Sequence, residues 1–131
     1  MIAGAGRGWS ATLPRVAGPS TLSGEIHFPA DAPSLMAADV RVLVEDVSRV
    51  DAAAPVVAET LLSGVDTGPG AALEFSLTVD VNDATHYNLR VHVDTDASGD
   101  VSVGDLITTQ SYPVLTFEAP SRATVSLQRV T

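Results

Sequence analysis

The chain has 131 residues, no cysteine, and sixteen acidic side chains against seven basic ones, which gives a net charge of -9. This length fits one domain that buries roughly two-thirds of the surface of its unfolded chain. The lack of cysteine excludes disulfides, thiolate zinc sites and a cysteine nucleophile. The negative charge makes nucleic acid an unfavourable partner, because phosphate backbones would be repelled.

Residues 1–20 contain four glycines and two prolines, together with Trp9, the only tryptophan. This composition predicts a flexible N-terminal arm, with the folded domain at residues 21–131. The arm has no continuous apolar core of the kind a signal peptide uses, and it has no lipobox cysteine. No run approaches the ~20 apolar residues of a membrane-spanning helix, so we expect no transmembrane segment.

Alternating apolar and polar residues predict a strand at 22–28, with Leu22, Ile26 and Phe28 on its buried face. Prolines in the following segment predict a loop at 29–39. The next run, 40–47, has apolar side chains on both faces, which indicates a central strand.

The rest of the chain repeats this pattern of short strands and turns. An alanine-rich stretch at 52–54 leaves a helical turn open as an alternative. Glycine and proline residues in the segment 63–71 predict a turn. Further strands are expected at 55–62, 73–79, 87–93, 106–112, 114–117 and 124–130.

About seven short strands without a convincing helix predict an all-β fold. We expect an antiparallel β-sandwich of the immunoglobulin or transthyretin type. Exposed sheet edges would also allow two copies to pair as a homodimer.

The segment from Asp94 to Asp105, DTDASGDVSVGD, has the spacing of a calcium-binding loop. Alternate residues of such a loop supply oxygens that converge on one cation, and a central glycine reverses the chain. Here Gly99 occupies the place of that glycine. The predicted ligands are Asp94, Asp96, Ser98, Asp100, Ser102 and Asp105.

Two features separate this loop from a calcium sensor. The last ligand is the aspartate Asp105 and not the longer glutamate, and the flanking segments are strands and not helices. A bound calcium ion would therefore be structural. The competing interpretation is a solvated turn, because turns favour the same residue types.

No catalytic group stands out, and we expect no enzymatic activity. His27, His86 and His92 lie on separate elements without metal-ligand spacing, so solvent-facing histidines are expected and not a zinc site. There is no nucleophile elbow and no glycine-rich phosphate loop between a strand and a helix.

Four segments resemble the YbaY and YscW-type lipoprotein family, which includes type III secretion pilotins. They are SGEIHFPADAP, VRVLVEDVSRVDAAAPVVAE, YNLRVHVD and TTQSYPVL, and VEDVSRVDA and SYPVL are the most specific parts. The resemblance covers Leu22 to Phe117. It implies a β-sandwich without enzymatic activity, a place in the cell envelope and, in some members, escort of an outer-membrane secretin.

The sequence thus predicts a non-catalytic accessory domain that binds a protein partner, with a structural calcium ion as a possible addition. The alternative is a calcium-dependent module that binds a small molecule or a carbohydrate.

Overall fold

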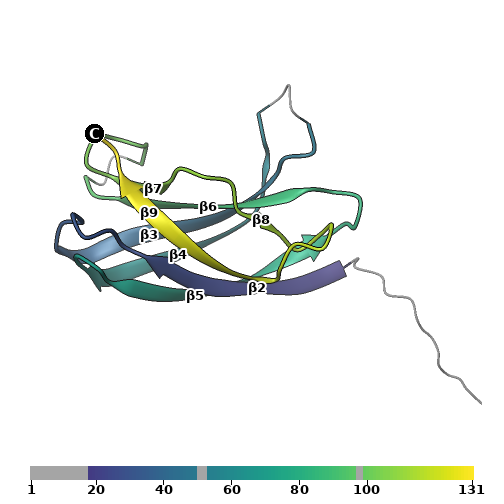
Figure 1. Cartoon of the computed structure of the whole chain (residues 1–131), viewed down its shortest axis with the longest axis horizontal. Helices are drawn as coiled ribbons and strands as arrows, with labels where there is room; N and C mark the ends of the chain where they lie inside the picture. Colours follow the sequence, from purple (N-terminus) through teal and green to yellow (C-terminus); the bar gives the residue numbers. More distant parts are fainter. Residues whose placement is uncertain (1–17, 50–52, 97–98) are drawn as a thin grey trace, which may run out of the picture.

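The computed structural model describes residues 18–49, 53–96 and 99–131, and these residues form an all-β fold without helices. Trp9 and Ser98 lie outside the described residues. The strands are β2 (Gly18–His27), β3 (Leu35–Asp46), β4 (Val56–Thr67), β5 (Ala72–Val81), β6 (Tyr87–Asp94), β7 (Leu106–Thr108), β8 (Pro113–Val114) and β9 (Arg122–Arg129) (Figure 1).

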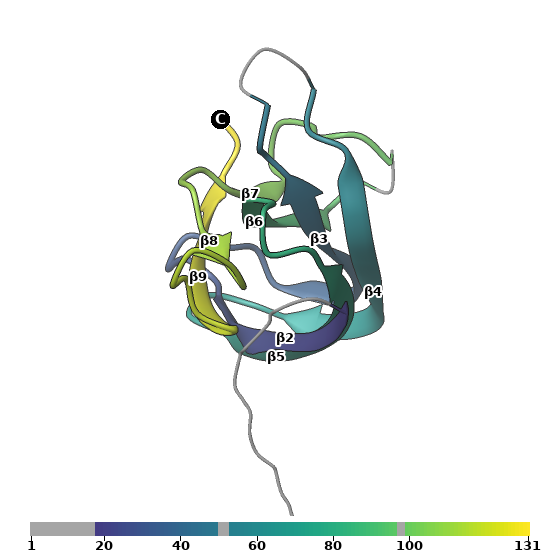
Figure 2. The same ribbon diagram turned by 90° about the vertical axis from the view of Figure 1, so that its right-hand side faces the viewer.

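The strands form one curled sheet in the order β4-β3-β6-β7-β9-β2-β5, and β8 pairs with β6 beside this path. Viewed along its interior, the sheet wraps around the core as a nearly closed barrel (Figure 2). The predicted all-β class is confirmed. The predicted sandwich is not clearly formed, because β9 joins the two halves of the sheet in place of a gap between two layers.

One strand pair runs parallel, which corrects the prediction of a fully antiparallel fold. Residues 23–27 of β2 pair in parallel with residues 122–126 of β9. On its other edge β2 pairs antiparallel with β5, and β9 pairs antiparallel with β7. The last strand, β9, therefore lies between β2, the first described strand, and β7.

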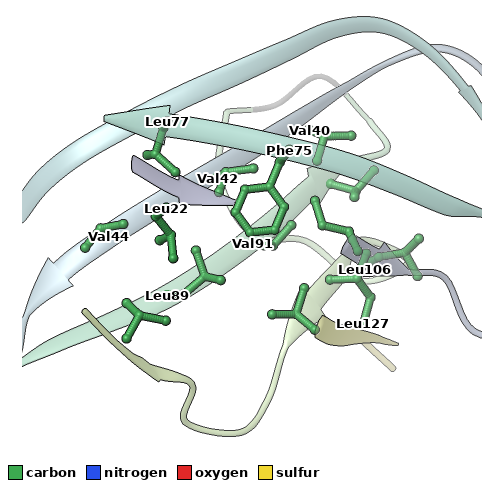
Figure 3. Packing of buried hydrophobic residues seen from close by; sticks show 14 of the residues in the cluster. Leu22, Val40, Val42, Val44, Phe75, Leu77, Leu89, Val91, Leu106 and Leu127 are labelled. Atoms are coloured by element: carbon green, nitrogen blue, oxygen red, sulfur yellow. The ribbon is translucent and has the colours of Figure 1, made fainter. Parts of the chain in front are cut away.

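The apolar faces of the strands meet inside the curled sheet, as alternation along each strand requires. Figure 3 shows this interior, where Leu22 of β2 and Val91 of β6 are fully buried. The other labelled side chains are Val40, Val42, Val44, Phe75, Leu77, Leu89, Leu106 and Leu127, from β3, β5, β6, β7 and β9.

Two of the predicted loops are shorter in the structure than the sequence suggested. Strand β3 begins at Leu35, inside the predicted loop 29–39, and β4 continues to Thr67, inside the predicted turn 63–71. Register shifts between Leu35 and Val40 let the two strands stay paired across these segments. Residues 53 and 54 are not helical; residue 52 lies outside the described residues.

Strand β4 forms one end of the sheet path and β5 the other. Three large apolar side chains of β4 are exposed by 44–50%: Val56, Val57 and Leu61. The homodimer through sheet edges stays a prediction.

None of the described residues forms a helix long and apolar enough to cross a membrane.

Gly24 on β2 faces the backbone of β9 without room for a side chain. A Cβ atom at Gly24 would lie 1.8 Å from the backbone oxygen of Ala123 and 2.9 Å from the ring of Phe75. We therefore expect Gly24→Ala to destabilise the fold by about 3 kcal/mol, because it forces the parallel pair apart. Chemical denaturation of the purified protein measures this change.

The matched control is Thr21→Ala on the same strand, where the side chain is exposed. Its free energy of unfolding should stay within about 0.5 kcal/mol of the parent. Equal stability of the Gly24→Ala protein and the parent would contradict the described contact between β2 and β9.

Candidate functional site

Asp105 is the organising residue of the segment that connects β6 to β7. Its side chain is fully buried, and both carboxylate oxygens accept hydrogen bonds. Oδ1 accepts from the backbone N–H and the hydroxyl of Thr95, at 2.9 and 2.7 Å. Oδ2 accepts from the backbone N–H of Ser102 at 2.9 Å and lies 2.8 Å from Nε2 of His92. The carboxylate therefore fastens the start and the end of the loop to β6.

Burial by itself raises the pKa of Asp105, but the hydrogen bonds from His92, Thr95 and Ser102 outweigh it and lower the pKa to about 2. Asp105 is thus ionised at neutral pH. Since an ionised carboxylate only accepts, Nε2 of His92 must carry the proton that it shares with Asp105.

Of the other predicted calcium ligands, Asp94 has a ligand atom close to Asp105. Oδ2 of Asp94 accepts the backbone N–H of Gly99 at 2.7 Å. Asp96 and Asp100 are exposed on the loop, and the hydroxyl of Ser102 donates to the carbonyl of Asp100 at 3.4 Å. Calcium binding by Asp94, Asp96, Ser98, Asp100, Ser102 and Asp105 stays a prediction.

Asp94 and Asp105 come together at this loop with a third residue, His92, which the predicted ligand set did not include. Among the described residues, single ligand atoms of His92, Asp94 and Asp105 lie within 4.8 Å of one another. Hydrogen bonds already use both oxygens of Asp105 and one oxygen of Asp94. Hydrogen bonds of both carboxylates therefore hold the described part of the loop in place.

The three histidines have three different environments. His27 is exposed and lies 3.1 Å from Glu25, as expected for a solvent-facing residue. The expectation is wrong for His92, which is only 7% exposed because it pairs with Asp105. His86 precedes β6, and its ring stacks on Phe117 with centroids 3.9 Å apart and planes 9° apart.

The stacked pair forms one wall of a cavity of about 310 Å³ at the first residues of β6. This end of β6 is opposite the Asp105 loop, which follows its last residue. We call this cavity the His86–Phe117 pocket. It is lined by Val47, His86, Tyr87, Asn88, Ser111, Pro113, Thr116, Phe117 and Ala119.

The segment after β8 keeps Phe117 on the surface. Phe117 is 57% exposed, and the φ angles of Leu115, Phe117 and Glu118 are 75°, 54° and 66°. Such angles are costly for residues with a side chain, and they persist only where surrounding contacts impose them. Here the hydroxyl of Thr116 donates to the carbonyl of Thr85 at 2.5 Å.

Two backbone hydrogen bonds close the same segment. The N–H of Leu115 donates to the carbonyl of Pro120 at 2.9 Å, and that of Ala119 donates to the carbonyl of Thr116 at 3.0 Å. The exposed aromatic ring is therefore held by a tight, strained turn.

This pocket was not predicted from the sequence. Its residues come from four separate segments, and the predicted strand 114–117 placed Phe117 in a sheet, although β8 ends at Val114. An aromatic residue followed by Glu118, Ala119 and Pro120 was the available signal of a turn.

Replacing Asp105 tests its role at the loop. Asp105→Asn keeps the size of the side chain but replaces one accepting oxygen with an NH₂ group. This group would face N–H or O–H groups that also donate, so hydrogen bonds would be lost. We expect the free energy of unfolding to fall by about 3 kcal/mol at neutral pH. The pKa of Asp105 is lowered from 3.8 to about 2 by folding, so its contribution is complete above pH 3.8 and is lost as pH falls toward 2. The difference between variant and parent should shrink over this interval in chemical denaturation.

Asp80→Asn is the control, because it removes the same charge from an exposed position on β5. It should change the stability by less than about 0.5 kcal/mol. A parent-to-Asp105→Asn difference that stays constant from pH 4 to pH 2 would contradict the assigned ionisation.

Comparison with known proteins places these features in a family. The family model described as type III secretion system lipoprotein chaperone (YscW) matches residues 17–127. Among solved structures, the chain is similar to an alternative pilotin from the type II secretion system of Vibrio cholerae, with 25% identity and a TM-score of 0.69. The similarity covers 86% of this chain and 98% of that one. No curated protein matches the chain.

The match includes every described strand up to the last residues of β9, and the similar structure spans most of the same region. It confirms the family resemblance deduced from the segments between Leu22 and Phe117. The chain belongs to the YscW family of type III secretion system lipoprotein chaperones.

Proposed function

We propose that this protein is a pilotin-like chaperone that binds a secretin, the outer-membrane channel subunit of a secretion system, and acts without catalysis. The single observation that carries this proposal is the family match over residues 17–127. The structural similarity to an alternative pilotin at a TM-score of 0.69 supports it independently of the family model.

The described geometry is consistent with a binding role. The buried pair of His92 and Asp105 is used for internal hydrogen bonds that position a loop. The His86–Phe117 pocket presents apolar and aromatic side chains, which are typical of protein-binding surfaces. A lipoprotein chaperone works at the cell envelope, and we propose the same location here.

The alternative of a carbohydrate-binding module receives no support from the family match. A structural calcium ion at the Asp94 to Asp105 loop is compatible with a chaperone, since it would only stiffen a connection between strands.

Co-purification tests the proposal. The full chain, carrying an affinity tag, is expressed with the secretin encoded in the same genome, and the secretin is expected to be retained at a stoichiometric ratio. An unrelated outer-membrane barrel protein serves as the control and should not be retained. Loss of the secretin in the first wash, with the tagged chain folded, would contradict the proposed function.

A further inference from the structure

We propose that the His86–Phe117 pocket is where the protein partner binds, and that it takes a large apolar side chain flanked by arginine or lysine. This inference rests on the proposed function and adds the location of the contact and its chemistry. Three properties of the pocket carry it: its shape, its rigidity and the charges around it.

The size of the pocket fits one anchoring side chain. Its volume of about 310 Å³ lies at the lower limit of small-molecule sites, about 300 to 1,000 Å³. Apolar groups of Val47, Pro113 and Phe117 border it, and the stacked rings of His86 and Phe117 both line it. An aromatic or branched aliphatic side chain can bury its surface against this apolar lining.

The pocket is already formed without the partner. Phe117 is fixed by the strained turn, and the hydrogen bond from Thr116 to Thr85 ties this turn to the segment that precedes β6. His86 is fixed from its other side, because its backbone N–H donates to the hydroxyl of Ser48 at 3.0 Å and its carbonyl accepts from Val47 at 2.9 Å. Because these residues are already ordered, little conformational entropy is lost when a partner binds, which favours high affinity.

The chain segments next to the pocket residues carry more acidic than basic side chains, which favours a basic partner. Within the segments 46–49, 82–88 and 115–119, the carboxylates are those of Asp46, Asp83 and Glu118. The only guanidinium in these segments is that of Arg49, and it interacts electrostatically with Asp46. The whole chain also carries a net charge of -9. Basic residues next to the anchor would therefore be attracted, whereas a second copy of this acidic chain would be repelled.

The experiment measures binding of short overlapping synthetic peptides that together cover the sequence of the same secretin. The full chain should bind those peptides in which a large apolar residue stands beside arginine or lysine. Phe117→Ala should weaken this binding roughly thirtyfold, as expected for a central aromatic anchor. Glu118→Lys should weaken it by up to about fivefold at low salt and by less at high salt.

Two matched variants control for nonspecific effects. Leu61→Ala removes a comparably exposed apolar side chain from β4, which does not line the pocket. Glu74→Lys makes the same charge change as Glu118→Lys at an exposed position of β5. Both should bind the peptides as the parent does, and thermal unfolding of all variants verifies that each is folded.

The outcomes separate the two proposals. If the parent binds neither the secretin nor its peptides, the proposed function is wrong and this inference is wrong with it. If the parent binds and folded Phe117→Ala binds equally well, the inference alone is wrong. If Phe117→Ala instead converts a dimer of the parent into a monomer in sedimentation, the pocket is occupied by a second copy and the inference is also wrong.

Discussion

The parallel pairing of β2 with β9 is the constraint on which the rest of this fold depends. It connects the two halves of the sheet, because β2 carries β5 on its other edge and β9 carries β7. Gly24 allows this pairing by leaving room for the backbone of Ala123. Without β9 in this position, the buried faces of β2 and β6 would not enclose the common interior in which Leu22 and Val91 pack.

The curled sheet places two different side-chain arrangements at opposite ends of β6. At the end of the strand, buried Asp105 collects hydrogen bonds from the loop and from His92. At its beginning, the strained turn after β8 holds Phe117 against His86. The first arrangement satisfies itself internally, whereas the second leaves an aromatic surface exposed. The pocket, and not the acidic loop, therefore offers a surface that a partner can contact.

Local patterns predicted much of the fold but little of the site. Strict alternation from Leu73 to Val79 and from Tyr87 to Val93 identified β5 and β6, because side chains of a half-buried strand alternate in every environment. The parallel pair was not predictable from such periodicity, since β2 and β9 are separated by most of the chain. The spacing of Asp94 to Asp105 drew attention to a real loop, but its role depends on the burial of Asp105 and on His92, neither of which the spacing encodes.

The central claim is that this YscW-family protein binds its partner at the end of the barrel that carries the His86–Phe117 pocket. Amide hydrogen exchange of the full chain, with and without bound secretin, tests it most directly. Binding should slow the exchange of amides in the segments 84–88 and 115–119, which border the pocket. Slowed exchange confined to the edge strand β4 or to the loop of Asp105, with these two segments unchanged, would contradict the claim.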